Sequence, residues 1–225
     1  MAEKVVLFDL ENTLIREWKD VSSYYFEAIR NSYGLSIDDI DLSKYEGMTV
    51  QETLIDILSK NGISRDDIYK KHELFLQELP YAHYNVAGHD SAVLVDGAKN
   101  LLRHLHSRDY VMGVASGQLE KILRNMFDRA GMHYDSYFKF GTYGDASESF
   151  SKILEASIDV AHKEFLSDKH HIYFVSNTKG HVASAHSMGI NAIGVITDQF
   201  SKKDLENIGM VHVAKSLKDC ERILK

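Results

Sequence analysis

The sequence is poor in cysteine and proline, with one of each, and it has no long apolar run. The single cysteine, Cys220, excludes an internal disulfide framework and a cysteine-rich metal site, and it fits a reducing cytoplasm. No apolar stretch approaches the roughly 18 residues that a membrane helix needs. The first ten residues lack the layout of a signal peptide, because their short apolar run ends at Asp9. We therefore expect a cytoplasmic protein with no membrane partner.

Charge of one sign is not concentrated anywhere along the chain. The net charge is −7, from 26 lysines and arginines against 33 aspartates and glutamates. Acids and bases are mixed and no basic block appears, so the sequence predicts no nucleic-acid partner. The 12 histidines are scattered, and no pair has the spacing of a zinc motif. The chain is 225 residues long and 44% hydrophobic, which is ordinary for a globular protein with a sizeable core.

A long stretch near the N-terminus shows helical patterns only. It follows residues 4–8, which are predicted to form a short buried strand. Thr49 and Glu52 form a capping box at the start of one helix. The only proline, Pro80, is expected to end another. Because no strand interrupts the stretch, residues 16–89 are interpreted as a helical insert. The predicted helices cover residues 21–34, 49–62 and 64–79.

From Asp96 onwards, helical and strand patterns alternate. Strands separated by helices imply crossover units, and therefore a parallel sheet with helices on both faces. The sequence thus predicts an α/β fold, with a Rossmann-like core formed by residues 1–15 and 90–225 and an α-helical insert between them. The predicted strands cover 110–115, 136–140, 171–175, 191–196 and 210–214, and the predicted helices cover 97–108, 117–131, 149–166, 179–189, 202–208 and 216–224.

Polar residues follow four of the predicted strands. Open parallel sheets bind ligands at the carboxyl ends of their strands. We therefore expect these residues to meet at one edge of the sheet. They are Asp9, Glu11 and Thr13 after the first strand, Ser116 and Gly117 after 110–115, Asp145 and Lys152 after 136–140, and Ser176, Asn177, Lys179 and His181 after 171–175.

The four motifs together resemble the haloacid dehalogenase (HAD) superfamily. DLENT comes first, VASG follows a later strand, a lysine leads a helix, and the cluster VSNTKGHV comes last. The helical insert resembles the cap of that family. The likeness covers essentially the whole chain and is greatest to the small phosphatases of the phosphoglycolate phosphatase type. It implies a phosphatase acting on a small phosphorylated metabolite.

The resemblance implies a role for each motif. Asp9 would be the nucleophile and form an aspartyl phosphate. Glu11 would protonate the leaving alcohol and later activate water. Ser116 and Gly117 would hold phosphate oxygens, and Lys152 would offset the negative charge. Thr13 would belong to the same binding loop, chiefly by steadying it.

The resemblance also implies a metal ion. Mg²⁺, with Mn²⁺ or another divalent ion as alternatives, would be held by Asp9, the carbonyl of Glu11 and Asn177. The phosphatases usually carry glycine and two acids where this chain has Ser176, Asn177 and His181. An amide offers an oxygen without charge, and imidazole suits softer metals than Mg²⁺. Metal binding is therefore the least secure part of the pattern.

Two further departures concern the acid and the lysine. The family's second acid is normally aspartate. Glu11 is longer by one methylene, so we expect activity that is retained but reduced. Ile153 stands where a proline often follows the lysine, and some relatives place a basic residue near Phe150 instead. Lys179 is an alternative source of positive charge, and Asp145 an additional acid near the metal.

Two alternatives to a phosphatase stay open. In the first, Asp9 attacks carbon, as in a metal-independent dehalogenase; Glu11 counts against it, because that branch usually has an aromatic residue there. In the second, the chain binds a phosphorylated ligand or a protein without turnover, as Asn177 and His181 suggest. We expect a monomer or small homo-oligomer. By analogy with caps of relatives, we also expect three residues of the insert to face the site: Tyr45, Gly47 and Met48.

Overall fold

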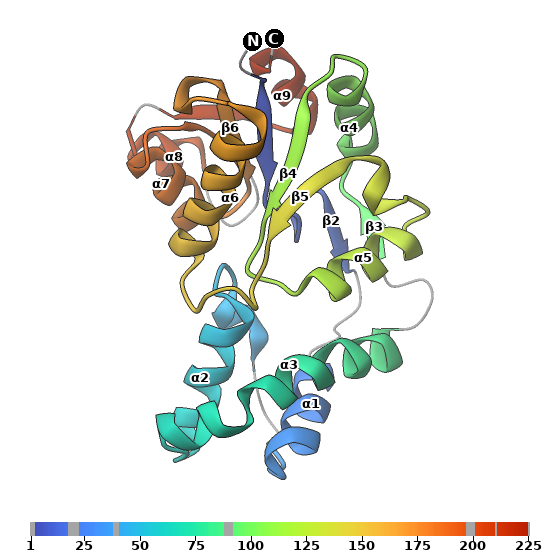
Figure 1. Ribbon diagram of the computed structural model, residues 1–225, viewed down its shortest axis with the longest axis vertical. Helices are drawn as coiled ribbons and strands as arrows, with labels where there is room; N and C mark the ends of the chain where they lie inside the picture. The colour runs from blue at the N-terminus through green and yellow to red at the C-terminus, as the bar shows by residue number, and fades with distance from the viewer. Residues whose placement is uncertain are drawn as a thin grey trace.

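A six-stranded parallel sheet forms the centre of the computed structural model (Figure 1). The structure describes residues 3–17, 23–37, 41–87, 92–196, 201–209 and 211–224. The strand order is β5-β4-β1-β6-β7-β8. The predicted α/β, Rossmann-like fold is confirmed. The strands of this sheet are β1 (Val5–Phe8), β4 (Val111–Ala115), β5 (Phe138–Thr142), β6 (Ile172–Ser176), β7 (Asn191–Val195) and β8 (His212–Ala214).

Strand β1 lies between β4 and β6, with Val5 opposite both Val111 and Ile172. Its side chains alternate between two buried layers, which explains why the sequence shows a continuous apolar run rather than alternation. Val6 and Phe8 pack with α4 (Ala98–His106), α5 (Glu120–Arg129) and α9 (Leu217–Ile223). Val5 and Leu7 pack on the other face, with α6 (Phe150–Phe165), α7 (Lys179–Ser187) and α8 (Lys202–Glu206).

The strand order reverses at β1. The chain adds β4 and β5 on one side of it, then crosses over to add β6, β7 and β8 on the other. In open α/β sheets a ligand crevice forms at such a point, outside the carboxyl ends of the strands. The loops after β1, β4 and β6, which carry three of the four motifs, therefore meet at this point.

We call residues 23–37 and 41–87 the helical segment; within this described part of the predicted insert lie a short 3₁₀-helix (Leu42–Tyr45) and three α-helices. The α-helices are α1 (Ser23–Tyr33), α2 (Val50–Lys60) and α3 (Arg65–Ala87). Thr49 caps α2 and accepts a hydrogen bond from the Glu52 amide at 3.1 Å, which is the Thr49 half of the predicted capping box. Figure 1 shows the segment grouped at one end of the molecule, beyond the edge of the sheet where β1, β4 and β6 end. Within the described part of the chain, no helix is long and apolar enough to cross a membrane.

Two short strands that the sequence did not predict flank the helical segment. β2 (Ile15–Glu17) and β3 (Ala92–Leu94) pair antiparallel where the chain leaves and rejoins the core. Strands of three residues are too short to show a recognisable alternation. Residues 21–22 of the first predicted helix, the predicted boundary at 89–90 and Met210 lie outside the described residues.

The prediction that Pro80 ends a helix is wrong, because α3 continues to Ala87. A proline inside a helix removes an N–H donor and costs about 3 kcal/mol. Packing beyond the proline outweighs this cost, because Ala82 and His83 are buried. The His83 Nε2 also lies 2.9 Å from the Glu17 Oε2 in β2. Tertiary contacts thus override the local preference.

Candidate active site

The loop after β1 continues the sheet by one residue and then turns sharply. The Asp9 amide donates to the Val175 carbonyl at 3.0 Å, which places the Asp9 side chain at the end of the ladder. The Leu10 carbonyl then accepts hydrogen bonds from three later amides of the loop. Asn12 adopts a left-handed conformation with φ 59°, which asparagine tolerates better than most residues. This turn brings Glu11 to the same cavity as Asp9.

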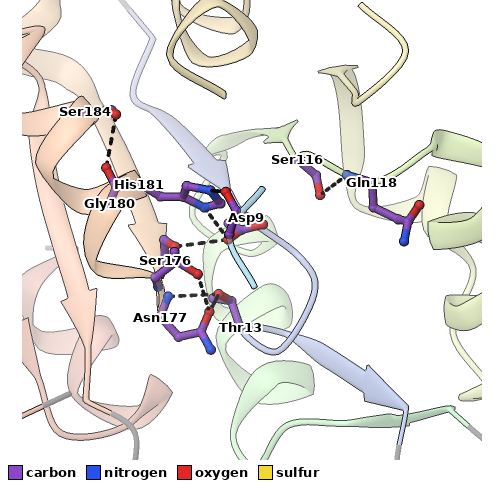
Figure 2. A network of polar contacts seen from close by, with 11 residues as sticks. Asp9, Thr13, Ser116, Gln118, Ser176, Asn177, Gly180, His181 and Ser184 are labelled. Atoms are coloured by element: carbon purple, nitrogen blue, oxygen red, sulfur yellow. Dashed lines mark hydrogen bonds and ion pairs between the residues drawn. The ribbon is translucent and has the colours of Figure 1, made fainter. Parts of the chain in front are cut away.

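The Asp9 carboxylate is buried and held from the β6 side of the site (Figure 2). Its Oδ2 accepts a hydrogen bond from the Ser176 Oγ at 3.1 Å, and the His181 Nδ1 lies 2.9 Å away. The other ring nitrogen of His181 lies 2.9 Å from the Gly47 carbonyl oxygen in the helical segment. The ring stacks on Phe150, with centroids 3.4 Å apart and planes at 10°. His181 therefore links the candidate nucleophile to two other parts of the molecule.

Glu11 has the electrostatics of a general acid. Its removal from solvent, followed by the nearby negative charges of Asp9 and Glu17, raises its pKa to about 7. Glu46 acts in the same direction more weakly, and a hydrogen bond with the Gln118 side chain opposes the shift. A carboxyl group with such a pKa can both donate and accept a proton near neutral pH.

Ser116 and Gly117 form a buried loop between β4 and the helical segment. The Ser116 Oγ accepts a hydrogen bond from the Gln118 amide at 3.3 Å. The Gly117 carbonyl accepts from the amide of Val50, the first residue of α2, at 2.8 Å. A Cβ at position 117 would lie 2.9 Å from the Met48 carbonyl oxygen, so this approach requires glycine. The loop thus borders the cavity and contacts the segment above it.

Thr13 and Asn177 bind each other rather than the cavity. The Thr13 Oγ1 donates to the Asn177 Oδ1 at 2.9 Å and accepts from the Asn177 amide at 3.0 Å. Both side chains are buried, and neither lines the cavity. The pair joins the loop after β1 to the loop after β6. This arrangement supports the expectation that Thr13 steadies its loop.

Neither candidate lysine lies at the cavity. Lys152 is exposed on α6. The Lys179 Nζ lies 3.9 Å from the Asp204 Oδ1, with half of its side chain exposed. Asp145 is exposed as well. Among the residues that the structure describes, no lysine or arginine lines the cavity.

The cavity has a volume of about 220 Å³ and lies between the strand ends and the helical segment. Tyr45, Gly47 and Met48 line it, as expected. The sequence did not indicate several other lining residues. Gln118 falls in the helix predicted at 117–131, but α5 begins only at Glu120, so Gln118 lies in the loop two residues after Ser116. Most of the others come from the helical segment, where only the three-dimensional fold shows them; they include Tyr24, Tyr25, Glu46 and Thr53.

The donor set at Asp9 does not fit a Mg²⁺ site. Mg²⁺ prefers near-octahedral oxygen ligands. Here the Asp9 Oδ2 binds Ser176 and His181, while the Asn177 Oδ1 accepts from Thr13. The groups face one another instead of converging on a common point. No cluster of three or more His, Cys, Asp or Glu side chains that could hold a metal occurs in the described ranges.

The chain belongs to the haloacid dehalogenase-like hydrolases, because the model of that family matches residues 6–195. The resemblance inferred from the four motifs is thus confirmed, and the chain is a hydrolase of this family. Phosphatases of the family generally use Mg²⁺. No curated protein sequence matches the chain.

Solved structures share the fold over the full length. A predicted phosphoglycolate phosphatase from Haemophilus somnus 129pt has a TM-score of 0.72 at 15% identity, covering 99% of this chain and 98% of that one. A predicted phosphatase from Clostridium acetobutylicum has a TM-score of 0.69 at 15% identity, covering 100% and 99%. A hydrolase from Pseudomonas syringae has a TM-score of 0.70 at 15% identity, covering 100% and 98%.

Proposed function

We propose that the chain is a phosphatase that cleaves a small phosphorylated metabolite through an aspartyl phosphate on Asp9. One observation carries this proposal: the Asp9 carboxylate and a Glu11 carboxyl with a pKa of about 7 border the same cavity. A nucleophile and a proton donor side by side are what such a reaction needs. Phosphatases among the structural neighbours support the same class.

The reaction has two steps. In the first, an Asp9 oxygen attacks phosphorus, the bond to the alcohol oxygen breaks, and Glu11 gives its proton to the departing alcohol. In the second, ionised Glu11 takes a proton from water, the water oxygen attacks phosphorus, and Asp9 leaves as a free carboxylate with release of phosphate. Ser116 and Gly117 would hold the non-reacting phosphate oxygens.

We also propose a role for the helical segment. Residues 16–89 would act as a cap, covering the cavity and selecting the substrate through residues such as Tyr45 and Glu46. Lys152 stays outside this mechanism because it is exposed away from the cavity. No step is assigned to Mg²⁺, because the donor set at Asp9 does not fit it.

A second candidate is hydrolysis at carbon, in which Asp9 attacks a substrate that carries no phosphate. The specific observation in its favour is the charge of the cavity. Asp9, Glu11 and Glu46 line it, and the described lining contains no lysine or arginine. Such a lining suits a substrate with less negative charge than a phosphate dianion, such as the monoanion of a 2-haloacid.

The test is phosphate release from a panel of small phosphoesters, run with and without Mg²⁺ and Mn²⁺. Asp9→Asn is expected to lower kcat by about 10⁴-fold or more, because it removes the nucleophile. Asp145→Asn is the matched control, since that aspartate is exposed outside the cavity. Release from no ester, combined with halide release from 2-haloacids, would favour the second candidate. Release that survives Asp9→Asn would contradict both.

A further inference from the structure

We propose that three buried side chains outside the cavity position Glu11, the proton donor of the proposed reaction. We call them the buried triad, and they come from β2, α3 and α5: Glu17, His83 and Arg129. They act on Glu11 through two residues that line the cavity, Tyr24 and Gln118. The inference rests on the proposed function, because it concerns Glu11 as the acid of that reaction.

The buried triad joins three elements where the helical segment meets the core. The His83 Nε2 lies 2.9 Å from the Glu17 Oε2, and the Arg129 Nη1 lies 3.4 Å from the Glu17 Oε1. A guanidinium can only donate hydrogen bonds, so the Arg129 Nη2 donates to the His83 Nδ1 at 3.3 Å. Each side chain thus contacts both of the others. Figure 1 shows α5 beside β2 and β3, on the side of the core that faces α3.

Burial makes the geometry of the triad hard to change. The His83 side chain is 1% exposed, and those of Glu17 and Arg129 are each 8% exposed. A buried charge is costly unless it stays paired, so Glu17 and Arg129 hold each other in place. Both nitrogens of the His83 ring have a partner, so the ring cannot turn without losing a contact. The triad is therefore a fixed support beside the site.

Tyr24 of α1 is the first residue that this support positions. Its ring packs on the His83 ring with centroids 5.0 Å apart and planes at 85°, the edge-to-face geometry that aromatic rings prefer. Tyr24 is 5% exposed, and its hydroxyl accepts a hydrogen bond from the Gln118 Nε2 at 3.5 Å. The place of this hydroxyl depends on the orientation of its ring, which His83 fixes.

Gln118 is the second residue, and it contacts Glu11 directly. Its Oε1 accepts a hydrogen bond from the Leu119 amide at 2.9 Å, which directs the Nε2 to the Tyr24 hydroxyl. Its side chain also hydrogen-bonds the Glu11 carboxyl group. Because catalytic geometry is sensitive on the ångström scale, a small shift of Gln118 should slow proton transfer to the leaving alcohol. The members of the triad are thus positioning residues that act through Tyr24 and Gln118.

Helix α5 gives the triad a second connection to Gln118. The helix begins at Glu120, two residues after Gln118, and ends at Arg129. Its apolar face is buried in the core. The two ends of a packed helix move together, so Arg129 constrains the loop that carries Gln118 as well as the His83 ring.

The first measurement compares kcat/KM for an alkyl phosphate and for p-nitrophenyl phosphate. The alkyl alcohol needs the proton of Glu11 to leave, whereas p-nitrophenolate leaves without it. Hydrolysis of the aspartyl phosphate is common to both esters and does not enter kcat/KM. His83→Gln and Tyr24→Phe should each lower kcat/KM for the alkyl ester by about 10–100-fold, and that for the aryl ester much less.

The ratio of the two kcat/KM values separates positioning from a merely structural role. Loss of folded protein lowers both values equally, so an unchanged ratio in His83→Gln and Tyr24→Phe would overturn the proposal. Arg129→Met should change the ratio in the same direction as His83→Gln. Arg124→Met is the matched control on the same helix, because Arg124 pairs with Glu120 and Asp135 instead, and it should leave the ratio unchanged.

The double variant tests the route through Tyr24. Tyr24→Phe keeps the ring that packs on His83 but removes the hydroxyl that holds Gln118. In that background, His83→Gln should change the ratio little further, because both substitutions interrupt the same path. Effects of the two substitutions that multiply in full would contradict this route.

A last measurement needs no substrate. The NMR signal of the Gln118 side-chain amide, assigned by its loss in Gln118→Met, reports on the mobility of this group through its ¹H–¹⁵N heteronuclear NOE. We expect a rigid amide in the native chain and in Arg124→Met, and a mobile one in His83→Gln and Tyr24→Phe. An amide equally rigid in all four would overturn the proposal. If no ester is hydrolysed, the proposed function fails, whereas this measurement still decides whether the triad positions Gln118.

Discussion

The loop after β1 and the loop after β6 both carry polar side chains to the same edge of the sheet, but they use them differently. The first directs Asp9 and Glu11 to the cavity. The second turns Ser176 and His181 onto Asp9, and Asn177 onto Thr13. One loop presents the candidate reactive groups, and the other holds Asp9 and Thr13 in position. A change of residue type in the second loop can therefore alter how Asp9 is held while the reactive loop stays the same.

Among the tests of the loop after β1, removal of the acidic proton of Glu11 is expected to have the largest effect on kcat. Glu11→Gln keeps the size of the side chain but removes the proton that the leaving alcohol needs. We expect kcat to fall by about 10²–10⁴-fold. Glu155→Gln is the matched control on the exposed face of α6. Steady-state kinetics with a good and a poor leaving group check this, and an equal loss with both would contradict the role of Glu11 as the acid.

The link between the two loops is open to a stability test. Thr13→Val keeps the shape of the side chain but removes two hydrogen bonds of Asn177: the one that its backbone N–H donates to the hydroxyl and the one that its side-chain Oδ1 accepts from it. We expect the free energy of unfolding to fall by about 1–3 kcal/mol. Thr142→Val, at a partly exposed position in β5, should change it much less. A urea melt of both variants measures the difference, and equal midpoints would refute the structural role of the pair.

The raised pKa of Glu11 predicts how stability depends on pH. The value rises from 4.5 to about 7 in the folded chain. Between these values the folded state binds more protons than the unfolded state, so the free energy of unfolding falls as pH rises through the window. Glu11→Gln lacks this proton and should show a shallower fall. Chemical unfolding of both chains at about pH 5 and about pH 8 measures this fall. An equal change in the free energy of unfolding in the two chains would contradict the raised pKa of Glu11.

The smallest effect is expected at Lys152, which belongs to neither loop. Its side chain is exposed on α6, and it is absent from the cavity lining. Lys152→Ala should leave the activation free energy and stability unchanged within about 0.5 kcal/mol. A tenfold loss of kcat would show that the lysine reaches the substrate after all, as the resemblance to the family implies.

The sequence predicts most of the core, because local signals determine it. The apolar run ending at Phe8 and the helices after Asp96 need only patterns of a few residues. The prediction from Pro80 was wrong because contacts with residues far away in the sequence stabilise the helix beyond the proline. For the same reason, local patterns predict only part of the candidate site. Asp9 and Glu11 follow a strand, and so they were found. The bond between Gly47 and His181 joins positions 134 residues apart, and no local pattern records it.

The pairing of β2 with β3 limits how the helical segment can move. The two strands are hydrogen-bonded to each other where the chain leaves and rejoins the core, from Ile15 opposite Leu94 to Glu17 opposite Ala92. A single connecting strand would permit rotation about its own axis, whereas a paired ribbon resists torsion. Twisting within the ribbon itself, between Ile15–Glu17 and Ala92–Leu94, is therefore resisted at this point. On the other side of the site, any displacement of Gly47 from the loop after β6 would break its contact with His181, the residue that also holds Asp9.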